Sequence, residues 1–297
     1  MADTPQLPIQ PVDKPILCNP FREPTAYWHY DEQGVAQKRD GRRPAGYYYL
    51  TDRTGTKGTM LPGLIAEENW DDLPLINRLR SDVKRWREKD YENATPTTKA
   101  LLRHWKRDDR PRRLFFCQIE AVETVIYLTE ILDAGKTPRY KLELTRDDFQ
   151  ALTKGEKPKF AEAVRTPPTL LDQPIEDHQP GLRRYGCKMA TGSGKTVVMA
   201  MLAAWSLCNR GKNYSDERFP GSILVMCPNL TVKERLQVLR PDSADNYYQA
   251  FDLVPPTLMP ELKKGRVLIE NWHQLALESE HSEGGKSYTV VQKGEES

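Results

Sequence analysis

The chain has 297 residues, of which 38% are hydrophobic and 29% charged, and its formal net charge is +2. These values are typical of one large or two ordinary globular domains, and they exclude nucleic-acid binding driven by the net charge of the whole chain. The five cysteines are widely spaced and form no Cys-x-x-Cys pair, which argues against a disulfide framework or a zinc site. We expect a cytoplasmic protein, because the sequence shows no signal-peptide pattern and no apolar run long enough to cross a membrane.

The first part of the chain is expected to be irregular and then helical. Residues 1–74 are rich in proline, tyrosine and glycine, which leaves room for a short hairpin around Thr54 to Gly58. Residues 75–107 carry apolar side chains at helical spacing and are predicted to form two helices, broken at Pro96.

The next segment, "LFFCQIEAVETVIYLTEIL" at residues 114–132, has the periodicity of a strongly amphipathic helix, and Gly135 follows as its stop. Residues 133–183 contain prolines and charges with little periodicity. We therefore expect an insertion or a long connection there, with one short helix at most.

From residue 185 onward, strand and helix patterns alternate, which predicts an α/β fold with a parallel sheet and right-handed crossovers. The expected elements are a strand at 185–189, a helix at 195–209 stopped by Gly211, a strand at 222–227, a helix at 229–239 and a strand at 266–272. The last 20 residues are polar and are expected to be loose.

Residues 189–196, "MATGSGKT", have the composition of a phosphate-binding turn between a strand and a helix. Glycines at 192 and 194 allow the backbone to wrap closely around an anion. Lys195 is then placed to reach the outer phosphates, and the Thr196 hydroxyl is placed to ligate Mg²⁺. We expect residues 191–196 (Thr191, Gly192, Ser193, Gly194, Lys195 and Thr196) to bind a nucleoside triphosphate, with Lys195 and Thr196 acting in catalysis. A chance Gly-Lys-Thr turn is the alternative.

This wording, with Met189 where the general pattern has glycine, resembles motif I of superfamily 2 helicases and translocases. Upstream, "RRLFFCQIEAVET" is similar to the glutamine-bearing segment of that superfamily, in which the glutamine reads the adenine edge. The resemblance implies that Gln118 and Arg113 bind the nucleotide. An ordinary exposed glutamine on an amphipathic helix is the alternative. Gln118 lies far ahead of Lys195, so the intervening residues would be a family-specific insertion.

Downstream, "LVMCPNLTVKERL" resembles motif Ia, which touches the nucleic-acid backbone. The candidates are Asn229, Thr231 and Lys233, because the free N–H groups of a helix that follows a strand can meet a phosphate. A plain turn with a capped helix is the alternative, and it is compatible with phosphate binding. Trp272, after the next strand, can stack on a base or sugar. A tryptophan buried beside the sheet is equally consistent with the sequence.

Together these segments look like the restriction subunit of type III restriction-modification systems, over roughly residues 110–275. The resemblance implies a RecA-like first motor domain at residues 110–297, incomplete and with its insertion at about 133–183, preceded by an irregular, helix-rich region at 1–109. It also implies ATP and Mg²⁺ as cofactors, with duplex DNA and a DNA methyltransferase subunit as partners.

The acidic motif II, a second motor domain and a nuclease site are not visible in the sequence. We therefore expect an N-terminal fragment of a larger ATP-dependent deoxyribonuclease, with weak nucleotide binding and little hydrolysis of its own. A self-contained, non-catalytic nucleotide-binding or DNA-docking module is the main alternative. A small-molecule P-loop kinase is a second alternative, against which the wording of the two motifs argues.

Two segments are locally basic. Residues 99–113 carry seven lysines and arginines against two aspartates, and residues 78–89 carry six basic against two acidic residues. Such segments either follow a DNA backbone or form ordinary solvated helix faces, and the second is the commoner case.

Overall fold

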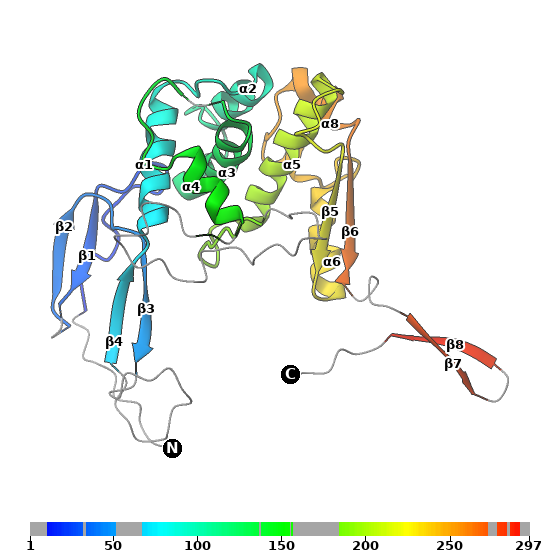
Figure 1. The fold of residues 1–297 in the computed structure, drawn as a ribbon, viewed down its shortest axis with the longest axis horizontal. Coiled ribbons are helices and arrows are strands. Elements are labelled where there is room, and N and C mark those ends of the chain that lie inside the picture. The colour runs from blue at the N-terminus through cyan, green and yellow to red at the C-terminus, as the bar shows by residue number, and fades with distance from the viewer. Residues whose placement is uncertain are drawn as a thin grey trace. The chain divides into compact units, whose positions relative to one another are not determined.

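The computed structural model describes residues 11–31, 34–51, 67–136, 138–154, 156, 184–272, 278–283 and 286–291. Helices and strands are mixed, and the strands form four two-stranded sheets, one of them parallel (Figure 1). The described residues divide into two compact units. Unit 1 contains those within 1–94 and 113–189, and unit 2 those within 95–112 and 190–297. The predicted division into 1–109 and 110–297 stays a prediction.

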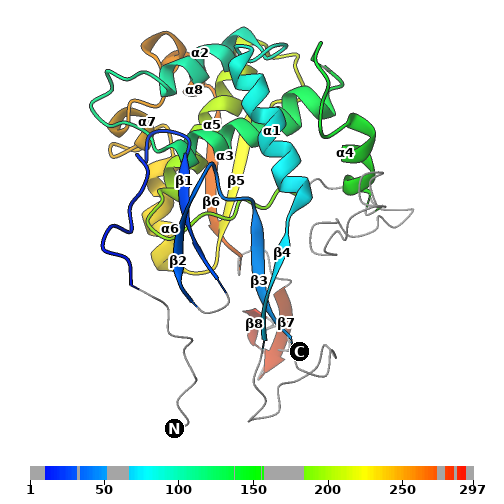
Figure 2. The same cartoon turned by 90° about the vertical axis from the view of Figure 1, so that its left-hand side faces the viewer.

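The N-terminal part of unit 1 is built from strands. β1 (Ala26–Tyr30) pairs antiparallel with β2 (Ala36–Asp40), and β3 (Gly46–Thr51) pairs antiparallel with β4 (Glu67–Asp72), as Figure 2 shows. The expectation of an irregular region is thus wrong for these residues. The aromatic runs "AYWHY" and "GYYYL" favour a pleated surface, and this propensity outweighs the surrounding prolines and glycines. The proposed hairpin turn at Thr54 to Gly58 lies outside the described residues.

The helices of unit 1 pack around aromatic side chains. They are α1 (Pro74–Glu88), α3 (Phe116–Ile126), a π-helical continuation at Tyr127–Asp133, and α4 (Arg146–Thr153). The helix predicted at 114–132 and the short helix predicted within the insertion are both confirmed. Trp86 of α1 is fully buried, with its ring centroid 4.9 Å from that of Tyr91 and 5.5 Å from that of Tyr127. Such tilted aromatic pairs add to the free energy gained by burial.

A buried carboxylate ties the insertion to α1. The two oxygens of Asp82 accept hydrogen bonds from the backbone N–H groups of Glu143 and Leu144, each at 2.8 Å. Burial raises the pKa of Asp82, and the two hydrogen bonds oppose that rise because they favour the charged form.

Unit 2 holds the parallel strand pair. Its helices are α2 (Pro96–Trp105), α5 (Lys195–Lys212), α6 (Leu230–Leu236), α7 (Tyr247–Ala250) and α8 (Met259–Leu262). β5 (Ser222–Cys227) and β6 (Arg266–Asn271) pair in parallel, which confirms both predicted strands and their direction. The predicted break at Pro96 is also confirmed, because this proline lies in the first turn of α2.

Three expectations for unit 2 and for residues 185–189, which precede it, are wrong. Residues 185–189 form no strand, and an interior glycine, Gly186, weakens that short segment. α5 runs on through Gly211, where a Cβ atom would lie 2.8 Å from the Glu261 carboxylate, so this glycine serves a close approach and not a helix stop. The polar C-terminal residues pair as β7 (Glu278–Glu283) and β8 (Lys286–Val291).

Candidate functional site

The predicted phosphate turn closes on one of its own carbonyl groups. The Ala190 carbonyl oxygen accepts hydrogen bonds from the Ser193 N–H at 3.3 Å, from Ser193 Oγ at 2.6 Å and from Lys195 Nζ at 3.0 Å. Gly192 and Gly194 adopt left-handed backbone conformations, with φ of 79° and 80°. The turn therefore needs glycine for its conformation, and its lysine folds back over the loop.

The helix behind the turn is fixed by a buried polar network. Trp205 Nε1 and Asn209 Nδ2 of α5 both donate to the Thr98 hydroxyl of α2, at 3.1 Å and 3.0 Å. Asn209 Nδ2 also donates to the Trp205 carbonyl at 2.8 Å, and the Thr95 hydroxyl donates to Asn209 Oδ1 at 2.5 Å. Buried donors and acceptors that are satisfied in this way hold a single geometry. The network thus fixes the C-terminal half of α5 against α2.

Gln118 and Arg113 belong to unit 1, whereas the phosphate turn belongs to unit 2. Gln118 is only 5% exposed, so the alternative of an ordinary exposed glutamine is wrong. Its Oε1 accepts a hydrogen bond from the Phe115 N–H at 2.8 Å and caps α3. The Arg113 guanidinium lies 4.8 Å from the Phe21 ring centroid. Both predicted nucleotide ligands thus have structural partners.

A buried charge cluster around Glu123, on the same helix as Gln118, was not found by the sequence reasoning. Glu123 of α3 is fully buried and accepts hydrogen bonds from Arg87 Nε at 2.9 Å, from Arg87 Nη2 at 2.6 Å and from the Tyr91 hydroxyl at 2.7 Å. Burial and the neighbouring carboxylate raise the pKa of Tyr91, so its phenol stays a donor. A glutamate on the apolar face of "QIEAVETVI" was the available signal, because a carboxylate there needs a partner.

The predicted motif Ia turn follows β5. Asn229 Oδ1 accepts a hydrogen bond from the Val232 N–H at 2.9 Å, which is the N-cap that the plain-turn alternative required. Thr231 is exposed, whereas Lys233 Nζ donates to Glu270 Oε2 at 2.6 Å. Of the three candidates, Asn229 and Lys233 therefore already have intramolecular partners. Glu270, the acidic partner within the apolar strand β6, was missed.

Trp272 directly follows β6 and is 47% exposed. The alternative of a tryptophan buried beside the sheet is therefore wrong. Its indole has enough open surface to stack on a flat ligand.

Several arginines of the basic segment 99–113 form hydrogen bonds and ion pairs within the protein. Arg107 Nη2 donates to Asp252 Oδ2 at 2.8 Å, Arg112 donates to the Ala250 carbonyl at 3.2 Å, and Arg110 bonds the Phe251 carbonyl. The Arg110 side chain is only 1% exposed. These three arginines hold the turn after α7, which leaves them poorly placed to follow a DNA backbone.

All five cysteines are free thiols. Within the described ranges, no helix is long and apolar enough to span a membrane. Comparison of the chain with protein-family models, with curated proteins and with solved structures gave no match.

Proposed function

We propose that this chain is the ATP-binding part of a DNA-dependent ATPase, with a RecA-like motor domain similar to that of type III restriction subunits. The observation that carries the proposal is the turn at residues 190–195. It combines two left-handed glycines, a lysine folded over the loop and an anchored helix that begins at that lysine. This combination fits a triphosphate, because the N–H groups of the first helical turn and the ammonium can converge on one anion.

In the contact described above, the Lys195 ammonium donates to the Ala190 carbonyl, which is a neutral acceptor. A phosphate oxygen is a stronger acceptor for an ammonium group, since both partners are then charged. Binding of nucleotide would thus draw Lys195 from Ala190 onto the phosphates. Ser193 holds the same carbonyl by two bonds and would keep the turn closed.

Mg²⁺ would be held by the Thr196 hydroxyl together with the phosphates. Among the described residues, no group of three or more histidine, cysteine or acidic side chains is placed to hold a metal ion. Mg²⁺ commonly retains waters and takes substrate phosphates as ligands, so this arrangement fits its chemistry. Bound in this way, it would neutralise charge on the phosphates.

The DNA part of the proposal rests on exposed groups at the carboxyl ends of the two parallel strands. Thr231 lies in the first turn of α6, the helix that follows β5, and Trp272 lies directly after β6. Both residues are exposed. In a parallel pair these ends lie at the same edge, so one strand of nucleic acid can meet both. A DNA methyltransferase subunit as a further partner is implied only by the resemblance.

Binding of a fluorescent ATP analogue in Mg²⁺ tests the proposal, with hydrolysis measured separately. Lys195→Ala should weaken binding at least about tenfold, because one charge-assisted contact is lost. Lys188→Ala is the matched control, since Lys188 is an exposed lysine just ahead of the turn. Equal binding by the Lys195→Ala and control variants would exclude the phosphate-binding role. Binding without turnover, with or without DNA, would favour a non-catalytic module over a motor.

A further inference from the structure

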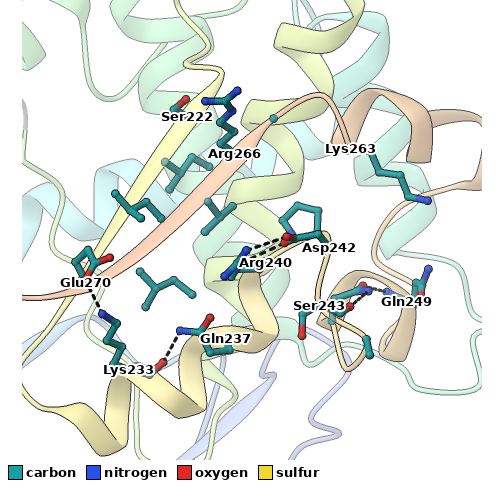
Figure 3. Close-up of a pocket in the computed structure, with 18 residues that line it drawn as sticks. Ser222, Lys233, Gln237, Arg240, Asp242, Ser243, Gln249, Lys263, Arg266 and Glu270 are labelled. Carbon is teal, nitrogen blue, oxygen red and sulfur yellow. Dashed lines mark hydrogen bonds and ion pairs between the residues drawn. The ribbon is translucent and has the colours of Figure 1, made fainter.

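β6 presents an open edge. Among the described residues it pairs with β5 alone, and a groove of about 1170 Å³ runs beside it (Figure 3). Five consecutive residues of the strand, 266–270, line this groove, together with Arg240, Ser243 and Gln249 from across it. Successive side chains of a strand point to opposite faces, so a space that touches all five reaches the edge of β6. Ser222 and Ile223 of β5 also line the groove, which therefore extends to the start of the neighbouring strand. Such an edge is a template for another strand.

The backbone groups at this edge can be assigned. The Arg266 N–H donates to the Gly221 carbonyl at 3.0 Å, on the β5 side. Because backbone groups alternate sides along a strand, Leu268 and Glu270 also address β5, whereas Val267 and Ile269 address the open edge. The open edge therefore offers two N–H and two C=O groups.

The side chains of β6 have a symmetric charge order. Arg266, Leu268 and Glu270 lie on one face, with a basic residue and an acidic residue each two positions from the central leucine. Leu268 is 55% exposed, and Leu224, its register partner on β5, is 53% exposed. The Arg266 side chain makes no hydrogen bond or ion pair with any residue in the part of the chain that the structure describes.

We propose that two copies of the chain associate by antiparallel pairing of β6 with β6, about a two-fold axis at Leu268. In this register Arg266 lies opposite Glu270 of the second copy, and Glu270 opposite its Arg266. Val267 and Ile269 lie opposite each other and exchange their open-edge hydrogen bonds. About a two-fold axis the same surface of both copies forms the interface, so each contact between two different residues occurs twice. This inference does not depend on nucleotide binding.

The register places each group in the position that suits it. Residues opposite each other without mutual hydrogen bonds have the closest side chains, and the two charge pairs and the Leu268 pair occupy these positions. Glu270 would retain its ion pair with Lys233 and form a second one with Arg266 of the other copy. A carboxylate can form both because its two oxygens accept several hydrogen bonds.

Sedimentation velocity over a range of concentrations tests the proposal on the whole chain. We expect a dimer, and we expect Arg266→Glu to raise its dissociation constant at least about tenfold, because two attractions become repulsions. A second variant, Lys233→Glu with Glu270→Arg, reverses the other charge while keeping an internal ion pair, and it should weaken the dimer similarly. An equimolar mixture of the two variants should restore association, because each charge then meets its opposite.

Leu268→Lys gives a test that leaves the Lys233–Glu270 pair untouched, since it places two ammonium groups at the axis. Leu224→Lys is its control, a leucine of nearly equal exposure on β5, away from the open edge. Far-ultraviolet circular dichroism checks that each variant is folded. A monomer at every concentration, a dimer indifferent to Arg266→Glu, or a mixture that does not associate would overturn the proposal.

Discussion

The side-chain oxygen of Gln118 accepts a hydrogen bond from the backbone N–H of Phe115, three residues earlier, at 2.8 Å. The glutamine thus caps the helix on which it lies, in the manner of the residue at the third position of a capping box. The same amide was predicted to read adenine. A substitution that removes one role and keeps the other can separate the two.

Gln118→Ala should lower the free energy of unfolding by about 1 kcal/mol, because the capping acceptor is lost. Gln118→Glu retains an acceptor oxygen at the same distance. Urea unfolding should therefore show a smaller decrease in the free energy of unfolding for this variant than for Gln118→Ala. Both variants lack the carboxamide donor, so both should lose any preference for ATP over GTP. If Gln118→Glu keeps that preference, the adenine role is wrong and the cap alone explains the residue.

Removal of the hydroxyl should affect the free energy of unfolding differently at two buried tyrosines of unit 1. Tyr91 donates to the buried Glu123 carboxylate at 2.7 Å, so Tyr91→Phe should cost about 2 kcal/mol. The hydroxyl of Tyr127 is buried without a hydrogen-bond partner among the described residues, so Tyr127→Phe should be neutral or stabilising. Denaturant unfolding of both variants measures the difference. A loss at Tyr127 as large as that at Tyr91 would contradict this reading.

Gly211→Ala should destabilise unit 2 although alanine is the better helix former. The added Cβ would lie 2.8 Å from Glu261 Oε2 and 2.9 Å from the Glu261 carbonyl oxygen, and such overpacking costs about 1–3 kcal/mol. Gly221→Ala is the control, because its nearest atom is Arg210 Cγ at 3.6 Å, an ordinary contact. Thermal melts compare the two. A stabilised Gly211→Ala variant would mean that α8 shifts freely.

Gly192→Ala should destabilise the glycine turn at residues 190–195 by about 1 kcal/mol, through backbone strain alone. A Cβ at this position meets nothing within 4 Å, so no steric clash contributes. Gly192→Asn should cost less, because asparagine tolerates the left-handed region. Hydrogen exchange of the first amides of α5 reports the loss. Equal exchange in the alanine and asparagine variants would show that the backbone conformation does not matter there.

Local pattern was enough for most elements of unit 2 and for the helices of unit 1. The helical spacing of Leu79, Val83 and Trp86 predicted the buried face of α1, and the unbroken apolar run of β5 predicted its strand. The helical signal succeeds because burial of one helix face imposes its own period on the sequence. The strand was indicated by the length and composition of its apolar run, although Leu224 and Met226 of β5 are exposed. β1, β2 and β4 were missed because their residues alternate weakly and proline and glycine surround them, whereas β3 lies in the segment where a short hairpin was expected.

The sequence by itself determined the glycine turn at residues 190–195, because a left-handed glycine and a helix start are local properties of a few adjacent residues. The pairing of Lys233 with Glu270, the burial of Gln118 and the use of Gly211 against Glu261 were decided only by the tertiary structure. The first and third join residues that are distant in the chain, and the second depends on which face of the helix is covered. The periodicity of the sequence does not specify these contacts, because the partners of a side chain depend on which elements pack against it in the folded chain.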